Sequence, residues 1–256
     1  MRRKAFLVAL VTCLLLSSCA SSGSPPRSPT ARLGNAQTSA PPPTRTPATS
    51  QPQPVASGGA GWQEAFRDDF GQDRGWTRRD DEYFRFWLEA GRLQLLAKQP
   101  GYVGFSLLAG KTYSDVAVEV DAVVEASPEG GRIGLTLRHT DQGYYQLEAS
   151  TQGAVSAFKF VRSENKIYTL KSDTTQAVRS AVRASNRLRA EARGSTLRLY
   201  ANGTLVLEVS DSSFVQGQVG LGFGTLAGGP GMQVSFDNLV IQIPASPPAQ
   251  AMAPMT

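Results

Sequence analysis

The chain of 256 residues contains two cysteines and one histidine. A single histidine, His139, gives no support to a histidine-rich metal centre or a Ser-His-Asp triad, and we expect it in a surface loop. Cys13 lies in the apolar N-terminal run and Cys19 directly follows that run, so the rest of the chain has no thiol and no disulfide. The fold must therefore rely on its core, which a domain of about 180 residues can do.

The chain also lacks acidic residues in its first 60 positions, and this absence explains its basic character. Six of the 26 Lys and Arg residues fall there, whereas residues 61–256 carry the other 20 against all 21 Asp and Glu. The net charge of that part is −1. This balance removes the main argument for nucleic-acid binding.

The N-terminus has the pattern of an exported protein. Residues 2–4 are basic, and residues 5–16 are almost wholly apolar but too short to span a bilayer comfortably. The following Leu-Ser-Ser-Cys, which ends at Cys19, resembles the lipobox of bacterial lipoproteins. The resemblance implies that residues 1–18 are a signal peptide and that Cys19 is lipidated, which anchors the chain to a membrane. The alternative is an ordinary signal peptide with a chance cysteine.

This anchor predicts the location of the protein. We expect a lipid-anchored, extracytoplasmic protein of the cell envelope. The residue after Cys19 is Ala20 rather than the aspartate that often retains lipoproteins in the inner membrane. If the host has an outer membrane, the chain is expected there.

Composition divides the remainder of the chain. Residues 19–60 are rich in Ser, Pro and Thr and have almost no large apolar side chain. They cannot bury enough surface to offset their chain entropy, so a disordered, semi-stiff linker is predicted. Residues 244–256 predict a disordered tail. One folded domain is expected over residues 61–243.

Apolar residues in this domain alternate with period two rather than 3.6. The pattern is clear over residues 116–124, 133–137 and 145–149, and turn signals such as Asn202-Gly203 separate such runs. No convincing amphipathic helix is found. The pattern predicts an all-β antiparallel sandwich or barrel, and one buried face per strand favours two stacked sheets.

The order of short motifs along the domain is also informative. These motifs are Phe66–Phe70, Gly75-Trp76, Gly91–Leu95, Tyr113–Val120, Gly134–Arg138, Gly143–Leu147, Asn186–Leu188, Leu199–Gly203, Gly217–Leu221 and Val234–Val240. The series resembles the concanavalin A-like lectin/glucanase jelly roll, in its laminin-G-like and family-16-glucanase-related bacterial forms. The resemblance implies two curved antiparallel sheets in a jelly-roll sandwich, with ligands or substrates on the concave sheet.

The glucanase active-site motif is not intact. Family-16 glycoside hydrolases carry Glu-x-Asp-x-Glu, and a retaining mechanism needs two carboxylates roughly 5 Å apart. The matching segment here offers Tyr144, Gln146 and Glu148, only one of which is a carboxylate. Glu119 and Asp121 share a face of a preceding strand and predict a solvated outer face. We therefore assign no catalytic residue, although an atypical glycosidase stays open.

Strand parity instead suggests a set of ligand contacts on the concave sheet. The set is Thr136, Arg138, Tyr144, Gln146, Glu148 and Lys159. An aromatic plane, a guanidinium and amide or carboxylate acceptors suit a sugar, whose CH groups stack on rings while its hydroxyls bond polar groups. In the alternative, Arg138 and Glu148 simply pair across strands.

The family resemblance also implies a structural calcium where the first and last strands meet. Its ligands would be Asp69, or Asp68, and Asp237. In the alternative, Asp237 bonds a nearby turn.

Three functions follow from these observations. The sequence favours non-catalytic recognition of a glycan or cell-envelope polysaccharide by a lipid-anchored module. The alternatives are a protein-interaction or structural envelope lipoprotein that binds an envelope protein and, less favoured, the atypical glycosidase.

Overall fold

The computed structural model describes residues 61–99, 101–126, 131–181, 183–224 and 231–245, and these residues form an all-β fold. Within them no helix is long and apolar enough to cross a membrane. The predictions for the signal peptide, for Cys19 and for the linker lie outside the described residues.

Nine strands form the larger sheet, in which every pairing is antiparallel. In spatial order they are β13 (Thr204–Ser210), β12 (Thr196–Ala201), β11 (Ser185–Arg193), β6 (Val116–Ala126), β15 (Met232–Pro244), β4 (Arg92–Ala97), β3 (Phe84–Glu89) and β2 (Arg79–Asp80), with β1 (Trp62–Asp68) paired to β15. The first and last strands of the domain are therefore neighbours.

Six strands form the second sheet, also antiparallel throughout. Their order is β10 (Lys166–Thr174), β9 (Ala154–Val161), β8 (Gly143–Ser150), β7 (Arg132–His139), β14 (Gln218–Gly224) and β5 (Val103–Leu107). A short 3-10 helix, η1 (Arg162–Glu164), joins β9 to β10.

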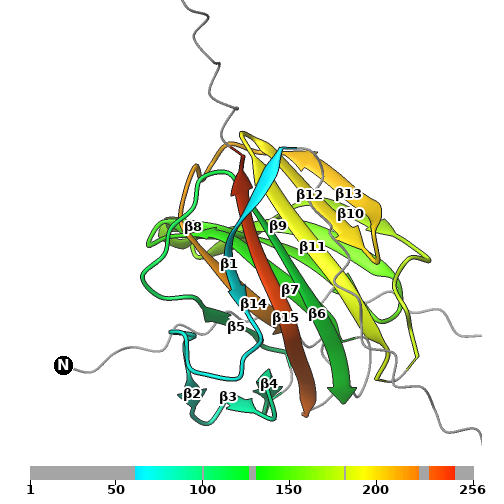
Figure 1. The fold of residues 1–256 in the computed structure, drawn as a ribbon. Helices are drawn as coiled ribbons and strands as arrows, with labels where there is room; N and C mark the ends of the chain where they lie inside the picture. The colour runs from blue at the N-terminus through cyan, green and yellow to red at the C-terminus, as the bar shows by residue number, and fades with distance from the viewer. Residues whose placement is uncertain (1–60, 100, 127–130, 182, 225–230, 246–256) are drawn as a thin grey trace, which may run out of the picture. The chain divides into compact units, whose positions relative to one another are not determined.

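The two sheets pack face to face around one core. Val118 and Val120 of β6 lie on its nine-stranded side, and Leu135 of β7 and Leu147 of β8 lie on its six-stranded side. Strand β11 contacts β7 and β12 contacts β8 across this core. Figure 1 shows β15, β6 and β11 side by side in one layer with the second sheet behind them. The predicted two-sheet antiparallel jelly roll is confirmed.

Turn chemistry fixes the register of individual hairpins. Asn202 and Gly203 both have positive φ, 50° and 84°, and they connect the paired residues Ala201 and Thr204. Two left-handed residues give a tight turn whose twist matches the strands beside it. The predicted Asn-Gly hairpin is confirmed.

Candidate functional site on the outer face of the six-stranded sheet

Strand β8 separates the core from the candidate site. Tyr145 and Leu147 point into the core, whereas Tyr144, Gln146 and Glu148 lie on the opposite, outer face. The alternation expected from the sequence holds along this strand.

An apolar cluster occupies one half of this outer face, apart from the core. We call it the aromatic cluster, and it consists of Phe105, Tyr144, Phe158, Phe160 and Ile167. The Tyr144 ring centroid lies 5.0 Å from that of Phe105 and 5.4 Å from that of Phe160. The outer face of an antiparallel sheet is ordinarily polar, so an apolar cluster here is unusual. Tyr144, Phe158 and Phe160 are themselves almost fully buried, and the half-buried Phe105 and Ile167 form the accessible edge of the cluster.

His139 extends the aromatic cluster. Its ring stacks on Tyr144 with centroids 5.6 Å apart and meets Phe105 at 5.4 Å. Burial and the positive charge of Arg162 lower the pKa of His139, which favours the neutral imidazole. The expected surface-loop residue is thus half-buried at the end of β7.

Buried polar side chains occupy the other half of the face. Gln146 Nε2 donates to Glu148 Oε1 at 2.8 Å, and Arg132 Nη1 donates to Glu148 Oε2 at 3.3 Å. Ser156 adds a 3.4 Å bond to Glu148, and Thr136 a 3.5 Å bond to Gln146. Burial raises the pKa of Glu148, although these donors oppose the shift. The polar half is a network whose members bond mainly to one another, although among the described residues the buried Arg132 Nε has no hydrogen-bond partner.

Glycines make room for this network. The side chain of Gln146 lies over Gly134 on β7 and near Gly222 on β14. Gly220, Gly222 and Gly224 alternate along β14 and pair with residues of β7 and β5. Without side chains there, the polar row of β8 can lie flat against the sheet.

The structure corrects the position of Arg138. Its guanidinium is buried and donates to the carbonyl oxygens of Ser114, Gly194 and Phe214, each at 2.9 Å. The regular alternation of side chains between the two faces of β7 fails at Arg138, because this residue has a φ of 52° and the β7–β14 register shifts beside it. Arg138 therefore ties together the β5–β6 connection, the β11–β12 turn and the β13–β14 loop. It does not face a ligand on the outer face of the sheet.

The structure also moves Lys159 off this face. Lys159 pairs with Tyr145, so it lies on the core side of the sheet, near its end. Its Nζ donates at 2.7 Å to both Asp211 and Ser213. The flanking residues Phe158 and Phe160 belong to the aromatic cluster and not to the core, which reverses the expected phase.

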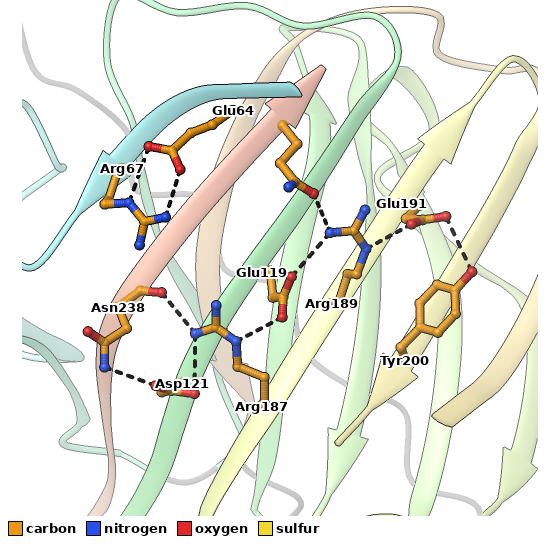
Figure 2. Close-up of polar contacts among 10 residues, drawn as sticks. Glu64, Arg67, Glu119, Asp121, Arg187, Arg189, Glu191, Tyr200 and Asn238 are labelled. Carbon is orange, nitrogen blue, oxygen red and sulfur yellow. Dashed lines mark hydrogen bonds and ion pairs between the residues drawn. The ribbon is translucent and has the colours of Figure 1, made fainter. Parts of the chain in front are cut away.

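Carboxylates are sparse on the outer face of the six-stranded sheet. Among the described residues of this face, Glu148 is the single carboxylate. Glu119 and Asp121 lie on the other sheet, where Arg187 and Arg189 pair with them (Figure 2). The described residues of this outer face therefore hold one carboxylate, whereas retaining glycosidases use two.

The two expected calcium ligands engage local partners. Asp69 Oδ1 accepts from the backbone N–H of Gly71 at 3.1 Å, and Asp237 Oδ1 from that of Asn238 at 2.6 Å. Asp68 accepts the Trp76 indole N–H at 2.8 Å. Within the described ranges no group of three or more His, Cys, Asp or Glu could hold a metal. These carboxylates alone do not make the oxygen-rich shell that calcium prefers, so calcium stays a prediction from the resemblance.

Comparison with known proteins places the fold. No protein-family model matches the chain, and no curated protein matches its sequence. A protein of unknown function with a galectin-like fold from Bacillus subtilis is similar, with 11% identity, a TM-score of 0.56, and 73% of this chain and 100% of that chain covered. The fold is a concanavalin A-like jelly roll.

Two enzymes share this jelly roll. An endo-β-1,3-glucanase from Pyrococcus furiosus has 13% identity and a TM-score of 0.54, with 73% of this chain and 96% of that chain covered. A κ-carrageenase from Pseudoalteromonas carrageenovora, in complex with an oligotetrasaccharide of κ-carrageenan, has 10% identity and a TM-score of 0.53, with 76% and 100% covered. At such identities the likeness shows the fold alone.

Proposed function

We propose that this chain is a lipid-anchored, extracytoplasmic module that binds carbohydrate without hydrolysing it. The observation that carries the proposal is the aromatic cluster on the outer face of the six-stranded sheet, next to a polar network. Sugar CH groups stack on aromatic rings, and sugar hydroxyls bond polar side chains at the ring edges. Phe105 and Ile167, the half-buried members of the aromatic cluster, are the ones that a saccharide would reach.

The fold supports the same class of ligand. The similar structures include one named for action on a β-1,3-glucan and one in complex with a carrageenan oligosaccharide. Within the described residues, Glu148 has no second carboxylate beside it, and a retaining glycosidase needs two. Binding is therefore proposed in place of hydrolysis.

The proposed lipid anchor would determine where the module works in the cell. Acylation of Cys19 and the Ser/Pro/Thr-rich residues 20–60 would hold the jelly roll at the end of a tether above the membrane. Labelling cells with a fatty-acid analogue tests this part. Wild-type protein should carry label and sediment with membranes, whereas Cys19→Ala should do neither. A labelled Cys19→Ala protein would contradict the lipidation site.

A glycan array tests the recognition. The protein without its signal peptide, made soluble by Cys19→Ser, should bind at least one saccharide. Phe105→Ala, which removes a half-exposed ring of the aromatic cluster, should weaken that binding about tenfold. Trp87→Ala on β3 of the other sheet is the control and should leave binding unchanged. An array without any bound saccharide would reject the proposal, and an envelope protein crosslinked in cells would then favour a protein-interaction role.

A further inference from the structure

A pocket of about 760 Å³ opens where the β7–β8 turn, helix η1 and the β13–β14 loop meet. We call it the rim pocket, and its wall includes Gln142, Lys159, Arg162, Tyr168, Ser213 and Phe214. Its volume is in the usual range for small-molecule sites, about 300–1,000 Å³. None of these residues belongs to the polar network on the outer face of the sheet.

One wall of the rim pocket is held rigidly by a hydrogen-bond network. Asp211 accepts from Lys159 at 2.7 Å and from the Tyr145 hydroxyl at 2.6 Å, and that hydroxyl in turn accepts the backbone N–H of Phe214 at 3.0 Å. Burial acts to raise the pKa of Asp211, but donors from Lys159, Ser213 and Tyr145 hold it below its usual range. The carboxylate stays charged and the loop stays fixed.

Arg138 also stabilises the wall of the rim pocket that contains Phe214. Its buried guanidinium donates to the Phe214 carbonyl oxygen at 2.9 Å. On the opposite side, the Arg162 backbone N–H donates to the Gln142 carbonyl oxygen at 2.8 Å and so joins the two turns that line the pocket. A site whose walls are already ordered loses little entropy when a ligand enters.

Charges of both signs line the rim pocket. Lys159 and Arg162 are opposed by Asp141 and Glu164, and Glu164 also accepts the Tyr168 hydroxyl. In the described part of the chain the exposed guanidinium of Arg162 makes no ion pair. A balanced lining offers donors and acceptors without a field that selects an anion or a cation.

We propose that the rim pocket binds a neutral sugar residue, with Arg162 and Gln142 donating to its hydroxyls. This inference rests on the proposed carbohydrate recognition and gives it a second subsite. Arg162 lines the rim pocket and follows Phe160 of the aromatic cluster by two residues, so the two sites adjoin along the chain. A saccharide seated in the pocket can therefore continue past Arg162 toward Ile167, a half-buried member of that cluster.

Isothermal titration with defined pentasaccharides tests the rim pocket. The probes are laminaripentaose, chitopentaose and cellopentaose as neutral sugars and a galacturonic acid pentamer as the acidic one. Wild-type protein should bind at least one neutral probe more tightly than the acidic one. Arg162→Ala should weaken that binding about tenfold, and Gln142→Ala by severalfold, because each removes hydrogen-bond donors to the sugar. Arg85→Ala, an exposed arginine on the other sheet, is the matched control and should bind like wild type.

The outcomes separate the rim pocket from the proposed function. If Phe105→Ala weakens binding while Arg162→Ala and Gln142→Ala keep wild-type affinity, the rim pocket is rejected and carbohydrate recognition stands. If none of these pentasaccharides binds while the glycan array shows a bound saccharide, the rim pocket as a site for these neutral sugars is rejected and carbohydrate recognition stands. If the array is also without a bound saccharide, both proposals fail. If the galacturonic acid pentamer binds more tightly than every neutral pentasaccharide, the proposal that the rim pocket prefers a neutral sugar is wrong. If the variants melt at the same temperature as wild type, their loss of affinity does not come from a loss of folded protein.

Discussion

Gln146 lies directly over Gly134 on the neighbouring strand. A Cβ atom on Gly134 would come within 2.4 Å of Gln146 Nε2. That nitrogen donates to the buried Glu148 carboxylate at 2.8 Å. The missing side chain on β7 therefore allows Gln146 to satisfy a charge that burial would otherwise leave short of partners.

Gly134→Ala should displace Gln146 and weaken its bond to Glu148. We expect the free energy of unfolding to fall by about 2 kcal/mol, the usual cost of a buried polar group that loses its partner. Urea unfolding measures the change. Gly224→Ala is the matched control on β14, since its Cβ would meet only Val103 and Glu148 atoms at 3.5 and 3.7 Å. Equal unfolding midpoints for the two variants would contradict the role assigned to Gly134.

Arg138→Ala should destabilise the fold without acting on a ligand directly. It would leave the carbonyl oxygens of Ser114, Gly194 and Phe214 without their shared donor, at a cost of about 3 kcal/mol or more. Arg138→Lys should recover only part of the loss, because one ammonium cannot reach all the acceptors that a guanidinium spans. Chemical denaturation of both variants checks this order. A fully stable Arg138→Ala protein with reduced glycan affinity would restore Arg138 as a ligand contact.

The sequence predicted the fold class well because the physical signal is local. Alternation over β6, β7 and β8 needs only a buried and an exposed face, and Asn202-Gly203 specifies a turn by its own backbone preferences. The order of the strands within each sheet depends on pairings distant in the chain, such as β1 with β15. Only the family resemblance pointed to that arrangement.

The candidate site was harder to predict because three residues in and around it break simple rules. Arg138 lies within β7, one residue before its end, but has a left-handed backbone, and an arginine at that position gives no sign of the change. Phe158 and Phe160 are apolar, which favours the core face of a strand, yet they face outward against Tyr144. Pairing across the β8–β9 hairpin, with Tyr144 opposite Phe160, was the one signal that could have corrected the phase of Lys159.

The stability that Asp211 contributes should depend on pH. Its pKa in the folded protein lies below the ordinary value of 3.8, so its bonds stabilise the fold above that pH and the contribution is lost as the pH falls below it. The difference in unfolding free energy between wild type and Asp211→Asn should therefore be constant from pH 7 to about 4 and shrink below that. Unfolding curves over this range measure it. Lys159→Met removes the main cation, and a pH dependence that is the same in that background would contradict the assigned pair.

The ion pairs on the outer face of the nine-stranded sheet should differ in strength according to burial. Glu119 is almost fully buried and accepts from both Arg187 at 2.9 Å and Arg189 at 3.1 Å (Figure 2). The Glu208 side chain is 49% exposed and pairs with Arg198. Glu119→Ala should cost about 3 kcal/mol, because it leaves two guanidinium groups short of a partner, and Glu208→Ala about 0.5 kcal/mol.

Urea unfolding at 0.05 M and 1 M salt separates these two pairs further. Salt screens exposed charges far more than buried ones, so the small effect of Glu208→Ala should vanish at high salt while that of Glu119→Ala persists. If both substitutions cost the same and respond equally to salt, the face is an ordinary solvated surface. In that case the sheet depends on its core alone for stability.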